Sequence, residues 1–388
     1  MTFKQVILYT TLLLIVLMGC AGAVVRKDAE NTPDAPHRRA GAAVENSASV
    51  ITIRPGDDVG ARFREIALMK TVKQINFEPG DYVISQSLEL PRTGSLVIVN
   101  GQGANLKAKG AIDIFRSIPT DQSQAMIWNK TRYLIHDFGR IEGGSRGVFI
   151  GSSFNTVIRN IEFIGQSTAA IDLVFCLMST VENILVTNVG HDGIVLRSAV
   201  DSQTGKHEWK GTSFNNSQCN HTVVQSCRVY NKKECTGTSF KILQSTGVRL
   251  LDCISEGWPN EHAVFFDAEK CTTAKLFSIE NFHLEHVPTN GALCFRSNGS
   301  IVTVDGLYLQ VGSKTSPSIW IMNNGNYVFK NIPWWPEGAW VKSSNSPYVV
   351  IEQTRASFAD FKNNWVNAEK PGQPIYQPYL DVKRKLVR

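Results

Sequence analysis

The sequence lacks the compositional biases that mark specialised classes of protein. Its 388 residues are 43% hydrophobic and 19% charged, an ordinary globular composition that excludes a disordered chain, a collagen, a coiled coil and a polytopic membrane protein. The charge excess is also small, 40 Lys and Arg against 34 Asp and Glu, so nucleic acid is not an expected partner. A mild positive excess is compatible with an acidic polymer as ligand.

Long hydrophobic runs are absent as well, and the one short run stands at the N-terminus. Lys4 precedes 13 uncharged residues, Val6 to Met18, whereas a membrane-spanning helix needs roughly 20. A basic start, an apolar segment and a small-residue exit predict an export signal. The segment Leu17-Met18-Gly19-Cys20 resembles a bacterial lipobox, which implies that Cys20 is lipidated and becomes the mature N-terminus.

These features predict the location of the protein. We expect a lipoprotein-type signal at 1–20, a tether at 21–48, and attachment to the membrane through a lipid anchor only. The expected location is the bacterial cell envelope, in the periplasm or on the outer membrane. If Cys20 is not lipidated, the protein is expected to be secreted.

Metal-binding spacings are missing from the cysteines. Seven follow Cys20, and none stands in a C-x-x-C or Cys/His pattern, so a structural zinc site is not expected. An odd number leaves at least one thiol free even if all the others pair.

Internal repetition is what the middle of the chain does contain. A segment with a small residue followed by alternating apolar residues recurs at steps of 23, 23, 46, 24, 29, 26 and 21 residues, and a second apolar segment follows. Each piece is rich in β-branched and aromatic residues and bounded by Gly, Asn or Ser, as strands are. The copies begin at Gly147, Ala170, Gly193, Ser239, Ala263, Ala292, Ser318 and, more weakly, Ala339.

This period is too short for a helix pair and suits three short strands per turn, which predicts an all-β parallel β-helix, a solenoid. A β-sandwich is the alternative, but its strands need not repeat at a fixed period. Alternation places the second and fourth residues of each copy inward. The expected inward stacks are Ile171, Ile194, Phe240, Val264, Leu293 and Ile319, and beside them Leu173, Leu196, Ile242, Phe266, Phe295 and Ile321.

The front of the domain fits a solenoid with a cover over its first coil. Asp57-Asp58, followed by apolar residues at helical spacing, predicts an N-terminal capping helix. The Pro79-Gly80-Asp81-Tyr82 turn, the Asn100-Gly-Gln-Gly103 turn and the segment 157–163 resemble the pectate lyase-like superfamily, which implies a right-handed parallel β-helix. We expect this domain at 49–355, with a C-terminal extended segment and basic tail at 356–388.

The repeat also predicts a charged strip on the outside of the solenoid. Aligned residues of adjacent coils lie about 4.8 Å apart, so the third and fifth positions of the copies map onto one face. The doubled step after Gly193 indicates an insert at about 200–218 that would overhang this strip, and loops on a rigid scaffold often carry function. The strip and its neighbours supply Asp172, His191, Asp192, Arg197, Lys241, His262, Asp267 and Arg296, and the insert supplies Trp209.

This charge pattern predicts a polysaccharide lyase or related enzyme acting on an acidic, uronate-containing polysaccharide. Arg and Lys would bind carboxylates, and Trp209 would stack on a sugar ring. In β-elimination one cation neutralises the uronate carboxylate while a base, Lys241 or His262, removes the C5 proton. We expect Lys241, His262 and Asp267 to be catalytic and Arg197, Arg296, Trp209, Asp172, His191 and Asp192 to bind substrate.

Other interpretations remain open. Hydrolysis needs two carboxylates, but Asp267 and Asp172 stand three coils apart, about 14 Å, too far for a retaining pair. Arg and Asp on neighbouring strands can also be simple cross-strand pairs. The catalytic motifs of pectate lyases, polygalacturonases and alginate epimerases are not present intact, so no residue roles are transferred. Epimerase activity and a non-catalytic envelope solenoid that binds a glycan or a protein partner are the alternatives.

No cofactor is required by the sequence. A calcium ion among Asp172, Asp192 and Asp267 is left open, because no ligand spacing demands it.

Overall fold

The computed structural model describes residues 50–367, apart from 70, 202–203, 211–216, 233–234, 258–260, 272–274, 287, 289, 311, 314, 334–335, 337, 344–347 and 353–364. The predicted signal at 1–20, the tether at 21–48 and most of the predicted C-terminal segment lie outside these residues. Among the residues described, no helix has the length and apolarity needed to cross a membrane.

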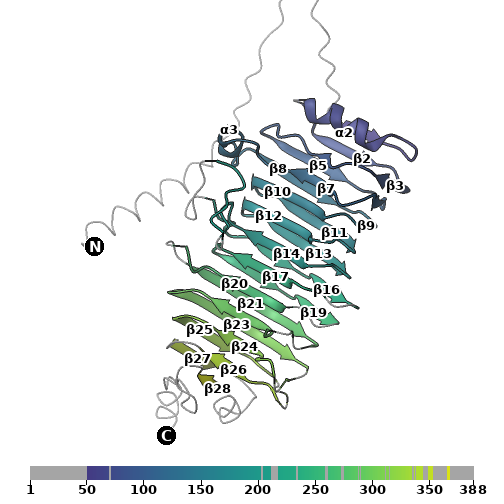
Figure 1. Ribbon diagram of the computed structural model, residues 1–388. Coiled ribbons are helices and arrows are strands. Elements are labelled where there is room, and N and C mark those ends of the chain that lie inside the picture. Colours follow the sequence, from purple (N-terminus) through teal and green to yellow (C-terminus); the bar gives the residue numbers. More distant parts are fainter. Residues whose placement is uncertain are drawn as a thin grey trace, which may run out of the picture. The chain divides into compact units, whose positions relative to one another are not determined.

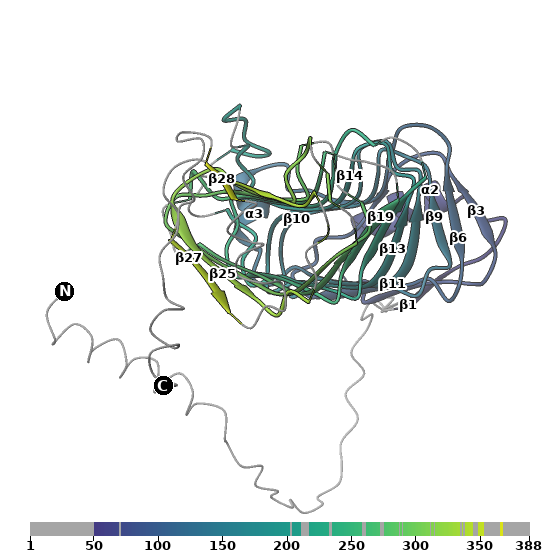
Figure 2. The same cartoon turned by 90° about the horizontal axis from the view of Figure 1, so that it is seen from below.

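The described strands coil into a parallel β-solenoid with two sheets that face each other across a core (Figures 1 and 2). The strand pairings within both sheets are parallel, as the prediction requires. The first sheet contains β4 (Leu88–Glu89), β7 (Asp113–Ser117), β10 (Arg146–Phe154), β12 (Ala169–Leu177), β14 (Asp192–Arg197), β17 (Thr238–Leu243), β20 (His262–Asp267), β22 (Leu293–Arg296), β24 (Ile319–Ile321), β26 (Val341–Ser343) and β28 (Trp365–Asn367).

The second sheet is built from two strand segments per coil, which accounts for three short strands per turn. It contains β1 (Val50–Ile53), β2 (Gln74–Phe77), β3 (Asp81–Ile84), β5 (Leu96–Asn100), β6 (Asn105–Ala108), β8 (Arg132–His136), β9 (Arg140–Glu142), β11 (Val157–Ile164), β13 (Thr180–Thr187), β15 (Val223–Gln225), β16 (Arg228–Asn231), β18 (Val248–Leu251), β19 (Ile254–Gly257), β21 (Leu276–Leu284), β23 (Ser300–Leu309), β25 (Gly325–Lys330) and β27 (Tyr348–Glu352).

The register of the first sheet confirms the repeat alignment. Ile171 pairs with Ile194, and Ile194 with Phe240 across the 46-residue step, so this step is one coil with an insert. All twelve residues of the two predicted inward stacks are buried, at most 1% exposed. The last copy lies one residue away from its predicted register: Ile319 pairs with Val341 and not with Trp340, because a step of 22 turns Val341 and Ser343 inward and keeps the charged Lys342 outward. The strand β28 also extends the sheet past the predicted end at 355.

The predicted capping helix is α2 (Val59–Leu68), which covers the first coil of the solenoid (Figure 1). The carboxylate of Asp58 accepts a hydrogen bond from the backbone N–H of Ala61 at 2.9 Å, which satisfies one of the unpaired donors at the helix start. Phe63 turns inward and packs against Phe77 and Phe115, with ring centroids 6.1 and 6.5 Å apart. The helix thus shields apolar side chains that the first coil would expose.

A row of turns in the left-handed backbone region bends each coil of the second sheet. Eight aligned residues form this row, which we call the asparagine ladder, and their φ angles lie between 49° and 77°, where Asn, Asp and Gly are favoured. Asn160 donates to Asp137 at 2.7 Å, and Asn183 donates to Asn160 at 3.0 Å. The ladder contains Asp137, Asn160, Asn183, Ser226, Asp252, Asn281, Gly306 and Asn331.

Candidate functional site

A groove of about 380 Å³ lies over the outer face of the first sheet, across β12, β14 and β17. We call it the charged groove. The segment after β14 forms one wall, as predicted for the insert, through Asp201, Thr204, Lys206 and Glu208. Four basic and four acidic side chains line the groove and leave it formally neutral: Arg146, Arg197, Lys206, Lys241, Asp172, Asp192, Asp201 and Glu208.

Asp172 is the centre of a buried ion network in this groove. Its side chain is 5% exposed and accepts hydrogen bonds from Arg146 Nε at 3.1 Å and from Arg197 Nε and Nη2 at 2.8 and 3.1 Å. Arg197 also contacts Glu208 at 2.7 Å, and Arg146 contacts Asp113 at 3.1 Å. Burial acts to lower the pKa of Arg197, but Asp172 and Glu208 outweigh it and raise that pKa. Arg197 is therefore held as a cation between two carboxylates.

Lys241 and Asp192 form a second, separate ion pair. Lys241 Nζ lies 3.1 Å from Asp192 Oδ2, and the two side chains are 18% and 9% exposed. Asp192 also accepts a hydrogen bond from the backbone N–H of Thr238 at 2.8 Å, which ties it to the strand that carries Lys241. His191 is more exposed, contacts Thr236 at 3.0 Å, and has its Nε2 3.7 Å from Asp192. Lys241 thus has one carboxylate partner, Asp192, whereas Arg197 has two.

His262 lies near Lys241 but does not line the groove. It is 5% exposed, and its Nδ1 lies 2.9 Å from the carbonyl oxygen of Gly291. Because a carbonyl only accepts, Nδ1 carries the proton and Nε2 holds the free lone pair. Burial and the positive charge of Lys241 lower the pKa of His262, against the opposing effects of Gly291 and Glu261. The imidazole is therefore kept neutral near neutral pH.

Asp267 and Arg296 do not line the charged groove; they lie one and two coils beyond Leu243, in register with it. Asp267 is 1% exposed and accepts hydrogen bonds from Arg296, from Gln244 at 3.0 Å and from the backbone of Glu269 at 3.1 Å. Burial acts to lower the pKa of Arg296, but the hydrogen bond and charge of Asp267 raise it. Neither residue lines the groove and Asp267 is almost fully buried, so the structure adds no support for the expected catalytic role of Asp267 or for substrate binding by Arg296.

Trp209 is also unsuited to the stacking role expected for it. The side chain is 4% exposed and packs in a small apolar cluster on the outside of the first sheet with Ala125, Phe149, Val174 and Ala199. Its ring therefore anchors the insert to the sheet and presents no face to a sugar. Trp209 thereby holds the adjacent groove wall, which carries Glu208, against the sheet.

Four charged groove residues, Arg146, Asp201, Lys206 and Glu208, were not among the predicted site residues. Arg146 aligns with Ala169, just outside the repeat segment that defined the strip, and Glu208 lies in the insert, whose path the repeat does not predict. Glu208 was visible only as one of several polar residues in the insert. Its 29% exposed side chain makes it the most accessible carboxylate of the two ion networks.

Within the residues described, no three His, Cys, Asp or Glu side chains gather as a metal-binding group. Asp172, Asp192 and Asp267, the residues considered for calcium, each contact a different basic side chain. The geometry thus supplies no observation in favour of a calcium ion at these carboxylates.

Comparison with known proteins relates this chain to others by fold only. No protein-family profile matches it, and no curated protein matches it. The catalytic domain of a GH87 α-1,3-glucanase in complex with nigerose is similar at 12% identity and a TM-score of 0.42, over 85% of this chain and 69% of that one. The catalytic domain of a GH87 α-1,3-glucanase D1069A variant in complex with tetrasaccharides is similar at 11% identity and a TM-score of 0.31, over 85% of this chain and 70% of that one. Values this low carry no information on substrate or reaction.

Proposed function

We propose that the protein is a carbohydrate-active enzyme that binds an acidic, uronate-containing polysaccharide in the charged groove and cleaves it by β-elimination. The observation that carries this proposal is the pairing of Lys241 with Asp192 beside the neutral His262. A lyase needs a cation to neutralise the substrate carboxylate and a base to accept a proton. Lys241, which lines the groove, supplies the cation, and the nearby buried His262 supplies the base.

The proposed step assigns these roles by charge state. Lys241, already a partner of one carboxylate, binds the uronate carboxylate and so acidifies the C5 proton. His262 Nε2, the unprotonated ring nitrogen, accepts that proton. The electron pair of the C5–H bond forms the C4–C5 double bond, the C4–O bond breaks, and the leaving oxygen takes a proton from water. Because His262 is 5% exposed and does not line the groove, the step requires a movement that opens Nε2 to the substrate once Asp192 releases Lys241.

The ion pairs also predict how substrate binds. Arg146, Arg197 and Lys241 each have a protein carboxylate as partner, so a uronate must compete with Asp192 for Lys241. Replacing Asp192 by Asn removes this competitor while keeping the shape of the side chain. D192N is therefore expected to bind uronate oligomers more tightly, a result that a neutral-sugar site would not produce.

The direct test is ultraviolet absorbance of the unsaturated uronate product as the chain from residue 21 meets polygalacturonate, alginate, glucuronan and hyaluronan, with and without calcium. Lys241→Ala and His262→Ala should abolish the signal in folded protein. Lys342→Ala is the matched control, because Lys342 lies in the same outward row four coils along and contacts the Trp320 ring at 4.1 Å. A flat trace on all four polymers would remove the lyase proposal for these substrates.

A hydrolase is the second candidate, since four carboxylates line the same groove. Glu208, with its accessible side chain, would donate a proton to the leaving oxygen, and Asp192 would activate water. Hydrolysis would be favoured if the protein released reducing ends without unsaturated product. Glu208→Gln and Asp192→Asn should then each abolish the release of reducing ends. Binding of a polymer with no cleavage by either assay would instead favour the non-catalytic solenoid.

We also propose that the protein is exported and held in the cell envelope by a lipid on Cys20. The support is the sequence of residues 4–20 alone. Mass spectrometry of the mature N-terminus tests it: a diacylglyceryl mass on Cys20 is expected, and Cys20→Ser should release the protein from the membrane fraction. An unmodified N-terminus would make the protein a secreted one.

A further inference from the structure

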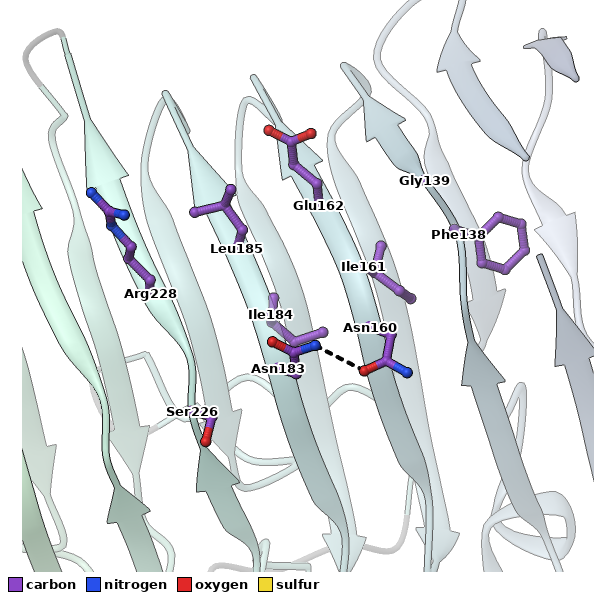
Figure 3. A pocket seen from close by; sticks show the side chains of 10 residues that line it. All are labelled: Phe138, Gly139, Asn160, Ile161, Glu162, Asn183, Ile184, Leu185, Ser226 and Arg228. Atoms are coloured by element: carbon purple, nitrogen blue, oxygen red, sulfur yellow. Dashed lines mark hydrogen bonds between the residues drawn. The ribbon is translucent and has the colours of Figure 1, made fainter. Parts of the chain in front are cut away.

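A second hollow, on the opposite sheet from the charged groove, has no part in the proposed reaction. Its volume is about 460 Å³, and it lies along the asparagine ladder on β11, β13 and β16 (Figure 3). We call it the ladder groove. Its lining includes the amides of Asn160 and Asn183, the hydroxyl of Ser226, the apolar side chain of Leu185 and the charged groups of Glu162 and Arg228.

At one end of the hollow a member of the ladder has a short side chain. Asn183 donates to Asn160 at 3.0 Å, a bond drawn in Figure 3, but the next position is Ser226. Among the described residues the Ser226 hydroxyl has no hydrogen bond to a neighbour, and the ladder resumes only at Asp252, which accepts from Asn281 at 3.0 Å. The amide oxygen of Asn183 therefore faces the gap that Ser226 leaves.

The charges of the ladder groove are already neutralised within the protein. Glu162 contacts Arg140 at 3.4 Å, and Arg228 forms an ion pair with Glu256. The groups left to meet a ligand are amides, a hydroxyl and the aliphatic face of Leu185. Amides both donate and accept hydrogen bonds, as sugar hydroxyls do, and an aliphatic face suits the C–H surface of a sugar ring.

The same outward row carries an aromatic side chain farther along the solenoid. The row runs through Leu185, Arg228, Ile254, His283 and Tyr308, one residue per coil. Tyr308 is 44% exposed, and the edge of its ring meets His283 with centroids 4.7 Å apart. Coils repeat at about 4.8 Å, a spacing similar to the length of one sugar unit, so a linear glycan can meet equivalent positions on successive coils.

We propose that the ladder groove is a second carbohydrate-binding site, which holds a neutral glycan chain along the solenoid axis. Asn183 hydrogen bonds to a sugar hydroxyl at the gap left by Ser226, and Asn160 to one on the preceding coil. Leu185 contacts a ring face, and Tyr308 stacks on a later unit. We expect the site to bind without cleaving, because Glu162 is the one carboxylate among its lining residues and glycoside hydrolysis needs two.

Native gel electrophoresis through laminarin, hydroxyethylcellulose, arabinoxylan or galactomannan tests this site. The full chain should be retarded by at least one of the four polymers. Ser226→Asn places the residue that the turn favours in the gap and should weaken retardation about tenfold, which corresponds to roughly 1.4 kcal/mol. Leu185→Glu should do the same. Leu276→Glu is the matched control, because Leu276 is an exposed leucine (44%) on the same sheet outside the groove.

The outcomes separate this site from the charged groove. Lys241→Ala and Lys241→Glu should leave retardation unchanged. No retardation by any of the four polymers, or equal retardation of the wild-type, Ser226→Asn and Leu185→Glu chains, would overturn the ladder site. Loss of retardation in the Lys241 variants would place neutral-glycan binding in the charged groove and would overturn it too. If Ser226→Asn fails to fold, Leu185→Glu decides the result.

Discussion

The charged groove and the ladder groove lie on opposite sheets of one solenoid and are held in different ways. The first depends on buried ion pairs, with Asp172 only 5% exposed between two arginines. The second depends on exposed amides in left-handed turns and contains no buried charge network. Both grooves lie where the repeat is irregular. The insert after β14 forms a wall of the charged groove, and Ser226 interrupts the asparagine ladder at the ladder groove. In a repeating fold, regular positions build the scaffold and irregular ones make room for ligands.

The largest effect should follow from Asp172→Ala. This change removes the buried carboxylate shared by the partly buried Arg146 and Arg197, which keep Asp113 and Glu208 as partners; breaking a buried ion pair costs about 3–5 kcal/mol, and we expect the low end here. The free energy of unfolding, measured in urea, should fall by about that amount. Asp81→Ala is the control, an acidic residue on β3 whose side chain is exposed. A loss below about 1 kcal/mol would mean that the network contributes no more than a surface pair does.

Trp209→Ala should have the next largest effect. Removing a buried indole typically costs about 3 kcal/mol, reduced here because the cluster lies on the outside of the sheet. We expect a loss of about 2 kcal/mol, with Trp209→Phe restoring most of it. Loss of activity without loss of stability would instead return Trp209 to the role of a sugar platform. The measurement is thermal unfolding beside the product assay.

The ladder should respond more weakly than the charged network. Asn183→Ala removes one exposed amide hydrogen bond and puts Ala in a turn with φ of 49°, which costs about 1 kcal/mol. Asn183→Gly should recover part of this loss, since Gly adopts the left-handed region freely. Urea unfolding of the two variants gives the comparison. A loss as large as that of Asp172→Ala would erase the distinction between the two grooves.

Between about pH 7 and 5, His262 should contribute to the pH dependence of stability. The pKa of His262 is lowered in the folded protein, so the unfolded chain takes up this proton first as pH falls below about 6.5. Its contribution to stability is complete above that pH and is lost as pH falls towards the folded value. His262→Gln should flatten the dependence of unfolding free energy on pH between about 7 and 5. Asn183→Ala, which changes no titrating group, should leave the slope unaltered.

Much of the scaffold was predictable because its period is recorded in residue types. The apolar alternation placed Ile194 opposite Ile171 and Phe240 across an insert, and the Asp58 cap marked the start of α2. The last copy shows the limit: Trp340 and Val341 are both apolar, so the first inward position alone does not choose between them. The charge of Lys342 two residues after Trp340 favours the observed register, in which Val341 pairs with Ile319.

The candidate site was less predictable, because exposure and ion pairing depend on which side chains the fold brings within reach. The repeat placed Arg197, Lys241, Asp267 and Arg296 on one face, but it could not show that Asp267 and Arg296 satisfy each other away from the groove. It also could not foresee that Trp209 is buried. The insert has no periodic pattern, and its path depends on contacts with residues distant in sequence.

The sequence by itself determined that this chain is a parallel solenoid, which residues fill its core and which positions face outward. These properties follow from local alternation repeated coil after coil, and hydrophobic burial permits only one register. The tertiary structure alone decided which outward charges neutralise one another and where the two hollows lie. Charge pairing over a few ångströms and the gap beside Ser226 depend on neighbours 23 to 46 residues away in the chain, and no local pattern records them.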